Sequence, residues 1–261
     1  MIDLHAHILP GLDDGPPATE AAVEMAVAAV RAGTRAVATT SHVNAGYGLS
    51  AGDIAAARAA LAERLAADGI ALELLAGGEV APERLPDLDD EDLRELTLGG
   101  GPCVLLECPF APMGSTMEPM VADLRRRGFA VLLAHPERSP TYQREPARLA
   151  RLVELGAVAQ VTGGALSGGF GDRAQRAAFG LLEAGLVHVL ASDSHDSTHR
   201  PPDPRLAAGV LDDRYGDVEE QLAWMTEAVP AALVAGAPLP PRPPLPRPRG
   251  MRARFRAWSA R

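Results

Sequence analysis

Short apolar segments alternate along this chain with longer amphipathic segments that end near a glycine. The apolar segments are rich in Val, Leu, Ile and Ala, which is typical of parallel strands buried on both faces. They lie at residues 2–5, 35–40, 72–77, 103–107, 130–134, 157–162 and 187–192. Helices are predicted between them, at residues 19–32, 54–67, 117–127, 147–155 and 173–184, and a glycine soon after the last periodic residue is the usual helix stop. Seven strands that alternate with helices indicate an α/β fold, either a barrel or a doubly wound sheet.

The composition indicates a globular domain followed by a tail. The chain has 261 residues, of which 47% are hydrophobic and 23% charged, and these values exclude a disordered or collagen-like chain. From residue 233 onwards proline becomes abundant and breaks regular structure. We therefore expect a single domain over residues 1–232 and an extended, disordered Pro/Arg-rich tail over residues 233–261. The tail either remains solvated without a partner or docks to an acidic partner or surface.

The net charge of −9 is unevenly distributed. Residues 229–261 contain seven Arg and no Asp or Glu, so the rest of the chain carries −16. This acidic body argues against nucleic acid as a partner, because a phosphate backbone needs a basic face. Cys103 and Cys108 form neither a CxxC pair nor a disulfide framework, which fits a reducing cytosol. We expect a cytoplasmic protein without a secretory signal or a membrane span, since no segment reaches ~18 consecutive apolar residues.

Histidine and carboxylate side chains follow the predicted strands where the strands end. His5 and His7 form an H-x-H pair, and because residues i and i+2 of a strand point to the same side, both imidazoles can reach one ion. Further candidates stand at the ends of other strands or just after the first one: Asp13, Asp14, His42, Glu79, Glu107, His135, Arg138, Asp193 and His195. The carboxyl ends of barrel strands meet on one face, where active sites are built. We therefore expect these side chains to share one site.

Bound metal ions would offset the desolvation energy that so many ionisable groups cost together. Mixed imidazole and carboxylate ligands suit Mn, Zn or Fe, although a single histidine is more often a satisfied core residue than a ligand. His188 lies inside a strand, five residues before Asp193, so the alternation of side chains turns it away and we expect a structural role. His199 lies in a loop, where it is either a solvated residue or an auxiliary acid.

Seven segments then carry a family resemblance, in this order: MIDLHAHILPGLDDGP, ATTSHV, GGEV, LLECP, LLAHPER, AQVTGGAL and GLVHVLASDSHDSTHRPP. They resemble the bacterial capsule-biosynthesis protein-tyrosine phosphatases of the CpsB/CapC type, within the PHP (polymerase and histidinol phosphatase) superfamily. The resemblance covers about residues 1–230 and implies a distorted (β/α)7 barrel. It also implies three divalent ions, usually Mn²⁺ with Fe, Zn or Co as alternatives. The implied substrate is a phosphotyrosine protein, often a bacterial tyrosine autokinase that controls polysaccharide export.

The resemblance further implies roles for individual residues. It implies a first metal held by His5, His7, Glu79 and Asp193, a second held by a bridging Glu79 with Glu107 and His135, and a third held by Asp14, His42 and His195. Arg138 and Arg200 match positions that contact the substrate phosphate, and an Arg side chain offers phosphate a planar, bidentate fork.

The expected reaction is hydrolysis of phosphotyrosine by a metal-activated hydroxide. Three groups are candidates for the proton donor to the leaving phenol: a metal-bound water, His42 and His199. A cysteine phosphatase is excluded, because neither Cys103 nor Cys108 is followed six residues later by Arg. Two alternatives stay open, namely a small-molecule phosphomonoesterase such as histidinol phosphatase and a non-catalytic regulatory binding module.

Overall fold

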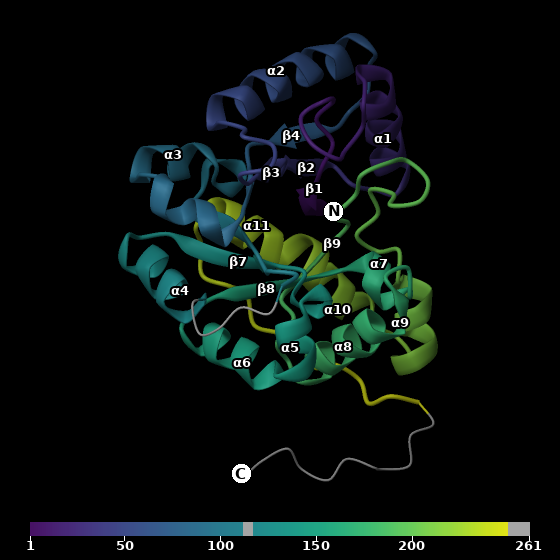
Figure 1. Cartoon of the computed structure of the whole chain (residues 1–261). Helices are drawn as coiled ribbons and strands as arrows, with labels where there is room; N and C mark the ends of the chain where they lie inside the picture. Colours follow the sequence, from purple (N-terminus) through teal and green to yellow (C-terminus); the bar gives the residue numbers. More distant parts are fainter. Residues whose placement is uncertain (112–116, 250–261) are drawn as a thin grey trace.

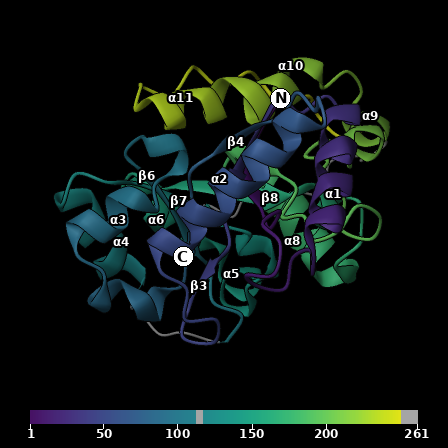
Figure 2. The ribbon, with the colours of Figure 1, turned by 90° about the horizontal axis from the view of Figure 1, so that it is seen from above.

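The computed structural model, which describes residues 1–111 and 117–249, forms a parallel barrel surrounded by helices (Figure 1; Figure 2). The strands are β1 (Ile2–Ala6), β2 (Ala36–Thr39), β3 (His42–Val43), β4 (Glu73–Leu75), β5 (Glu79–Val80), β6 (Cys103–Glu107), β7 (Ala130–Ala134), β8 (Val158–Thr162) and β9 (Val189–Ala191). They pair in parallel in two sheets, one in the order β1-β2-β4 and one in the order β3-β5-β6-β7-β8-β9.

The two sheets close into one ring. β3 continues β2 after a short break, and β5 continues β4, so each pair acts as a single bent strand. On the other side β9 returns to β1: Ala6 forms a parallel bridge with Ser194, and the Asp193 N–H donates to the His5 carbonyl at 2.8 Å. The result is seven strand positions around a distorted (β/α)7 barrel, which confirms the predicted fold. All seven predicted strands are present, whereas β3 and β5, two residues each, are too short to show a sequence pattern.

Helices cover the outside of the barrel. They are α1 (Thr19–Arg31), α2 (Ala51–Ala67), α3 (Asp90–Glu95), α4 (Met117–Arg126), α5 (Pro140–Arg144), α6 (Pro146–Glu154), α7 (Gly163–Leu166), α8 (Gly171–Glu183), α9 (Ala208–Tyr215), α10 (Glu219–Ala223) and α11 (Val229–Ala235). The five predicted helices are confirmed as α1, α2, α4, α6 and α8, with ends that differ by at most three residues. The start of α2 differs most, because Ser50 and Asp53 form a capping box there. Among the described residues, no helix is long and apolar enough to cross a membrane.

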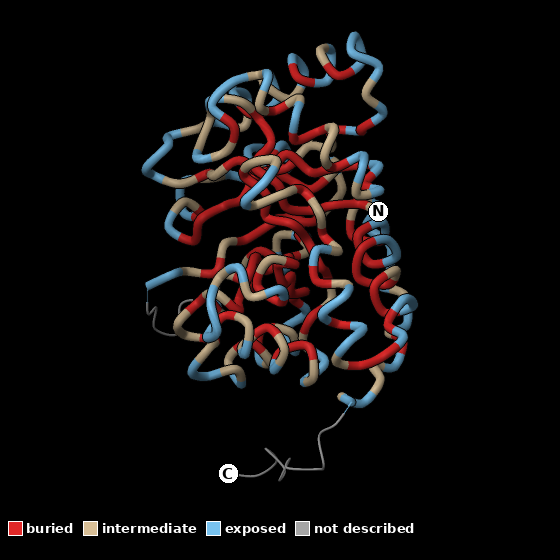
Figure 3. Tube along the Cα trace, turned by 90° about the vertical axis from the view of Figure 1, so that its right-hand side faces the viewer, coloured by how far each residue is buried: buried red, intermediate tan, exposed pale blue. Residues whose placement is uncertain are grey.

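Aliphatic side chains of the strands form the core. The central residues of β6 and β7 are fully buried, as expected for strands covered on both faces. Figure 3 shows this buried interior and the exposed outer turns of the helices. Each buried Leu or Val contributes about 1.5–3 kcal/mol to folding. The carboxyl ends of the strands differ, since their buried residues include histidines and carboxylates.

The C-terminal segment does not begin as a free tail. The boundary expected at residue 232 falls inside α11, and the segment after α11, which has no regular secondary structure, contacts the body through Pro240, Arg242 and Arg249. Trp224 Nε1 donates to the Pro240 carbonyl at 3.1 Å, and the Arg242 guanidinium lies 4.4 Å from the centre of the Trp224 ring while it donates to the Val187 carbonyl. Sequence composition did not predict these contacts, because abundant proline indicates only that a segment lacks regular secondary structure. The rest of the tail, residues 250–261, lies outside the described residues.

Candidate metal centre

Two residues of the candidate site have left-handed backbone conformations. His135, directly after β7, has φ 35°, and Asp193, shortly after β9, has φ 51°. They are the two non-glycine residues with positive φ in the described chain. Such conformations cost of order 1–3 kcal/mol each in non-glycine residues and cluster at functional sites. Here the sharp turns leave both side chains buried at the carboxyl end of the barrel.

The first group of side chains consists of His5, His7 and Asp193, all buried. Nε2 of His5 lies 3.2 Å from Nε2 of His7, and Oδ1 of Asp193 lies 3.4 and 3.6 Å from these two nitrogens. Two ligands about 2.1 Å from one metal ion lie roughly 3.0–3.5 Å apart, depending on the coordination angle. The three atoms are therefore spaced as neighbouring ligands of a single ion.

The neighbours of His5 and His7 fix which ring nitrogen carries the proton. Nδ1 of His5 lies 3.1 Å from Oε1 of Gln160, and Nδ1 of His7 lies 2.8 Å from Oδ2 of Asp13. Each of these oxygens is an acceptor, so each Nδ1 carries a proton and each neutral ring keeps its lone pair on Nε2. Two lone pairs that face each other at 3.2 Å repel unless a cation or a proton lies between them. Outer partners of this kind orient metal-ligating histidines in known sites.

Glu79 lies in the middle of the second group. Its Oε1 is 2.9 Å from Nε2 of His135 and 3.4 Å from Nε2 of His5. Its Oε2 is 3.0 Å from Nδ1 of His42, yet both of these buried atoms lack a hydrogen bond of good geometry. The two atoms are thus close together without a hydrogen bond between them, which is the arrangement expected of two ligands that share one ion.

The grouping around Glu79 differs from the one that the resemblance implied. Glu107 lies with Glu79 and His42, whereas His135 lies with Glu79 and His5. The reason is that the two carboxylate oxygens of Glu79 face different sides of the cluster. Glu79 remains the residue common to both groups, which is the geometry that a bridging carboxylate requires.

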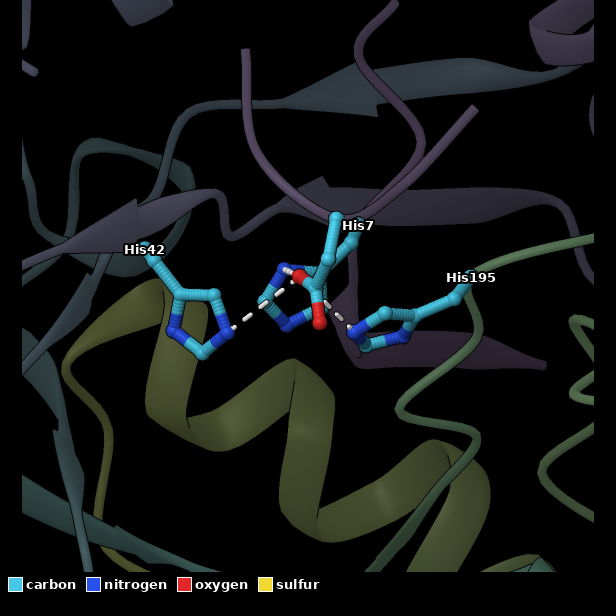
Figure 4. Close-up of side chains that lie close together, drawn as sticks. His7, His42 and His195 are labelled. Atoms are coloured by element: carbon cyan, nitrogen blue, oxygen red, sulfur yellow. Dashed lines mark ion pairs between the residues drawn. The ribbon is translucent and has the colours of Figure 1, made fainter. Parts of the chain in front are cut away.

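The third group lies nearer to solvent. Oδ1 of Asp14 is 3.4 Å from Nε2 of His42 and 3.2 Å from Nε2 of His195, and His7 lies beside them. Figure 4 shows His42 and His195 on either side of His7, with dashed lines for their ion pairs. Asp14 is the most exposed member, so this group forms the outer part of the cluster. All nine predicted ligands therefore come together in one continuous set of side chains.

Electrostatics in the cluster favour added positive charge. Burial lowers the pKa of His7, but hydrogen bonds with Asp13 and Glu79 outweigh burial and raise this pKa to about 9. Burial also lowers the pKa of His42, but hydrogen bonds with Asp14 and Glu79 outweigh burial and raise this pKa to about 11. Burial and repulsion from Glu79 raise the pKa of Glu107 to about 7. The common cause of these shifts is the close spacing of the carboxylates, whose negative charge attracts positive charge to the site.

Two residues that position the cluster were not assigned roles from the sequence. Asp13 accepts a hydrogen bond from His7 and another from the backbone N–H of His42, at 3.0 Å. Gln160 contacts both His5 and the backbone N–H of His135. Position 15, two residues after Asp13, requires a glycine, because a Cβ there would lie 2.4 Å from the His7 carbonyl oxygen. The DDG sequence was a visible signal for Asp13, whereas a lone glutamine inside a strand gave none.

Arg138 and Arg200, which the resemblance implies as phosphate contacts, stand at the edge of the cluster. Nη1 of Arg138 and Nη2 of Arg200 both donate to Oδ2 of Asp193, at 2.5 and 2.7 Å. The guanidinium groups lie 4.3 and 5.4 Å from the centre of the Phe170 ring. Burial of Asp193 raises its pKa, but nearby His5, His135 and the two arginines outweigh burial and hold this pKa low.

Four other residues that the sequence analysis considered lie outside the cluster. His188 packs near Trp224 and accepts a hydrogen bond from the Ala159 N–H at 3.3 Å, as expected for a structural residue. The side chain of His199 is 92% exposed and lies beside Asp196. Cys103 and Cys108 are buried free thiols, and burial raises the pKa of Cys103 to about 12, which suits an inert core residue.

The barrel, with imidazoles and carboxylates gathered at the carboxyl ends of its strands, defines the class of the metal-dependent hydrolases. The family model for capsular polysaccharide synthesis, CpsB/CapC, matches residues 1–229. The chain belongs to this CpsB/CapC family.

Named relatives agree with this membership. The chain is 37% identical over 222 residues to the tyrosine-protein phosphatase YwqE of Bacillus subtilis, which covers 83% of this chain and 85% of the relative. It is 28% identical over 224 residues to the tyrosine-protein phosphatase CpsB of Streptococcus pneumoniae, with 83% and 91% covered. A solved structure from the study of YwqE and CpsB, described there as unique metal-dependent tyrosine phosphatases, matches with a TM-score of 0.83 and 33% identity. The match covers 94% of this chain and 99% of that one.

Proposed function

We propose that this chain is a metal-dependent protein-tyrosine phosphatase. The observation that carries the proposal is the convergence of Arg138 and Arg200 on one oxygen of Asp193, at the edge of a cluster suited to metal ions. Arg forks match the geometry of phosphate oxygens, and cations beside them favour a dianionic substrate. The names of the relatives, tyrosine-protein phosphatases, support the same activity.

We propose three divalent ions in the cluster, with Mn²⁺ as the first candidate and Fe, Zn or Co as alternatives. The proposed ligands are His5, His7, Asp14, His42, Glu79, Glu107, His135, Asp193 and His195. When bound, the ions supply an activated water for attack on phosphorus and neutralise charge on the phosphoryl oxygens. Three divalent ions exceed the charge of the four ligating carboxylates, so a phosphate dianion is attracted to an otherwise acidic protein.

The protein's own groups bind and orient the substrate. Arg138 and Arg200 each use one nitrogen on Asp193, which leaves further donors for the phosphate oxygens. One such donor is Nε of Arg200, which is buried without a hydrogen-bond partner. Phe170 stacks on both guanidinium groups and limits their rotation.

A proton donor assists departure of the phenol, whose pKa is ~10. His42 lies inside the cluster beside Asp14 and Glu79. His199 is turned towards Asp196 in an exposed loop. Both nitrogens of His42 face cluster carboxylates and His42 is a proposed metal ligand, so neither histidine is placed to give this proton to the phenol.

The proposed substrate is a phosphotyrosine protein, most specifically a bacterial tyrosine kinase that regulates capsule or exopolysaccharide assembly in the cytoplasm. The family's description in terms of capsular polysaccharide synthesis supports this setting. Residues 1–232 carry the proposed catalytic site. The Pro/Arg-rich tail expected over residues 233–261 contains seven Arg and no acidic residue. Arg242 packs against Trp224, and the other arginines suit an acidic partner or surface.

The test compares two substrates with the Mn²⁺-loaded protein. We expect kcat/KM for a phosphotyrosine peptide to exceed kcat/KM for histidinol phosphate by more than about tenfold, equivalent to ~1.4 kcal/mol. The reverse preference would indicate a small-molecule phosphomonoesterase instead. Less than one transition-metal equivalent per chain after native purification, with no turnover after Mn²⁺ is added, would favour a non-catalytic binding module.

A further inference from the structure

Two exposed aromatic side chains lie on the rim of the metal-suited cluster. Of the large hydrophobic residues that are exposed in the described chain, only Tyr47 and Phe110 are aromatic, at 43% and 47% exposed. Tyr47 stacks on His42, with ring centres 5.7 Å apart and planes 2° apart. Phe110 stacks on His135, with ring centres 5.4 Å apart and planes 20° apart. A chain with 4% aromatic residues thus places both of its described exposed rings beside the candidate site.

The two rings differ in their relation to the arginines. The Arg138 guanidinium lies 4.9 Å from the centre of the Phe110 ring and 4.3 Å from that of Phe170, so it is held between two aromatic side chains. Within the described residues, Tyr47 has no such contact with Arg138 or Arg200. Phe110 is therefore the exposed ring that lies next to the group proposed to hold the phosphate.

The backbone around Phe110 is anchored to the site. The hydroxyl of Ser139 donates to the carbonyl of Pro109 at 2.7 Å, which ties the residue before Phe110 to the residue after Arg138. The backbone beside the Phe110 ring is therefore tied to the segment that carries Arg138. A half-exposed aromatic ring on an anchored backbone is a suitable wall for an apolar ligand.

The direction of phosphoryl transfer places the leaving group on the same side. In an in-line displacement the leaving oxygen lies opposite the attacking one. If Arg138 and Arg200 hold the phosphate as proposed, the attacking water would come from the side of the cluster. The ester oxygen and its substituent consequently point away from the cluster, out over the rim where Phe110 lies.

We propose that Phe110 is the specificity wall that packs against the aromatic ring of the substrate and selects aryl over alkyl phosphomonoesters. This inference rests on the proposed phosphatase function and adds the residue that contacts the leaving group. Aromatic pairs with offset or edge contact gain beyond their buried area. The wall therefore favours a phenyl group over an alkyl group at the same position.

Binding of non-hydrolysable phosphonates to the Mn²⁺-loaded protein tests the proposed role of Phe110 without turnover. Isothermal titration calorimetry with benzylphosphonate and ethylphosphonate compares an aryl and an alkyl group on the same phosphonate head. We expect the wild type to bind benzylphosphonate about tenfold more tightly. In Phe110→Leu, which keeps an apolar side chain without a ring, we expect this ratio to fall below about threefold, and Phe110→Tyr is expected to restore it.

Tyr47→Leu is the matched control, since Tyr47 also stacks on a cluster imidazole but does not touch the arginines. Its aryl-to-alkyl ratio is expected to stay within twofold of that of the wild type. The inference would be overturned by an unchanged ratio in Phe110→Leu, or by a collapse of the ratio in Tyr47→Leu alone. It would also be overturned if the wild type hydrolyses a phosphotyrosine peptide but binds both phosphonates equally or not at all. Failure of the proposed function shows itself differently, as a wild type that does not hydrolyse the peptide.

Discussion

Nε2 of His5 and Nε2 of His7 face each other at 3.2 Å, and both carry lone pairs when the rings are neutral. Asp13 and Gln160 hold the protons of these rings on the opposite nitrogens. The contact is stabilising only when positive charge lies between the two atoms. Asp193 and Glu79 complete the surroundings of that point with carboxylate oxygens. This arrangement supports the proposed metal ion at the buried histidine pair.

Asp13→Asn should weaken metal binding, because it removes the charge that holds the Nδ1 proton of His7. Outer partners of metal-bound histidines contribute about 10–100-fold to metal affinity. Competition with a chromogenic chelator measures the change. Asp172→Asn is the control, since the Asp172 side chain is exposed on α8 and is not among the side chains of the cluster. Equal metal affinity in Asp13→Asn and the wild type would contradict the proposed role of Asp13.

Arg138→Lys should weaken phosphate binding while the metal content stays unchanged. A lysine ammonium keeps the charge but cannot donate through a planar fork or stack between Phe110 and Phe170. We expect kcat/KM for a phosphotyrosine peptide to fall at least tenfold. Arg176→Lys, on the exposed surface of α8, serves as the control. A variant with wild-type kinetics would remove Arg138 from the phosphate site.

The stability of the fold should fall in mild acid through His188. Burial and repulsion from Arg242 lower the pKa of His188 to about 4, whereas it is ~6.5 in the unfolded chain. Below pH ~6.5 the unfolded chain therefore binds a proton that the folded chain refuses. The stability due to neutral His188 is complete above this pH and is lost as the pH falls towards 4, by about 2 kcal/mol at pH 5.

Urea denaturation at pH 7 and pH 5 measures this loss. His188→Asn keeps an acceptor for the Ala159 N–H but does not titrate. The fall in the free energy of unfolding between the two pH values should be smaller in His188→Asn than in the wild type by about 2 kcal/mol. Equal falls in the two proteins would show that His188 is protonated in the folded state as readily as in the unfolded one.

Arg242→Ala should release the C-terminal segment from the barrel. The substitution removes a cation–π contact with Trp224 and a hydrogen bond to the Val187 carbonyl, together worth about 1–3 kcal/mol. Arg247→Ala, an exposed residue of the same segment, is the control. A drop in Tm for Arg242→Ala alone, with unchanged metal content, is the expected result. Equal Tm values would mean that the packed segment adds nothing to stability.

The sequence predicted the features that follow a hydrophobic period or lie at the ends of strands. Seven strands, five amphipathic helices and nine clustered side chains were all visible, because apolar runs and strand ends follow simple rules. It did not reveal Gln160, whose role depends on which strands become neighbours. Nor did it reveal that Trp224 would hold Pro240 and Arg242, because that contact joins a helix to a segment without a pattern. Long-range pairing is the information that composition and periodicity lack.

Anomalous diffraction at the manganese absorption edge, from crystals of the Mn²⁺-loaded protein, tests the central claim most directly. We predict anomalous peaks within the cluster, one of them about 2.0–2.3 Å from Nε2 of both His5 and His7. Crystals grown at the same pH with a chelator should lack these peaks. Peaks confined to other parts of the molecule, or His5 and His7 rotated away from each other in the Mn²⁺-loaded protein, would contradict the account.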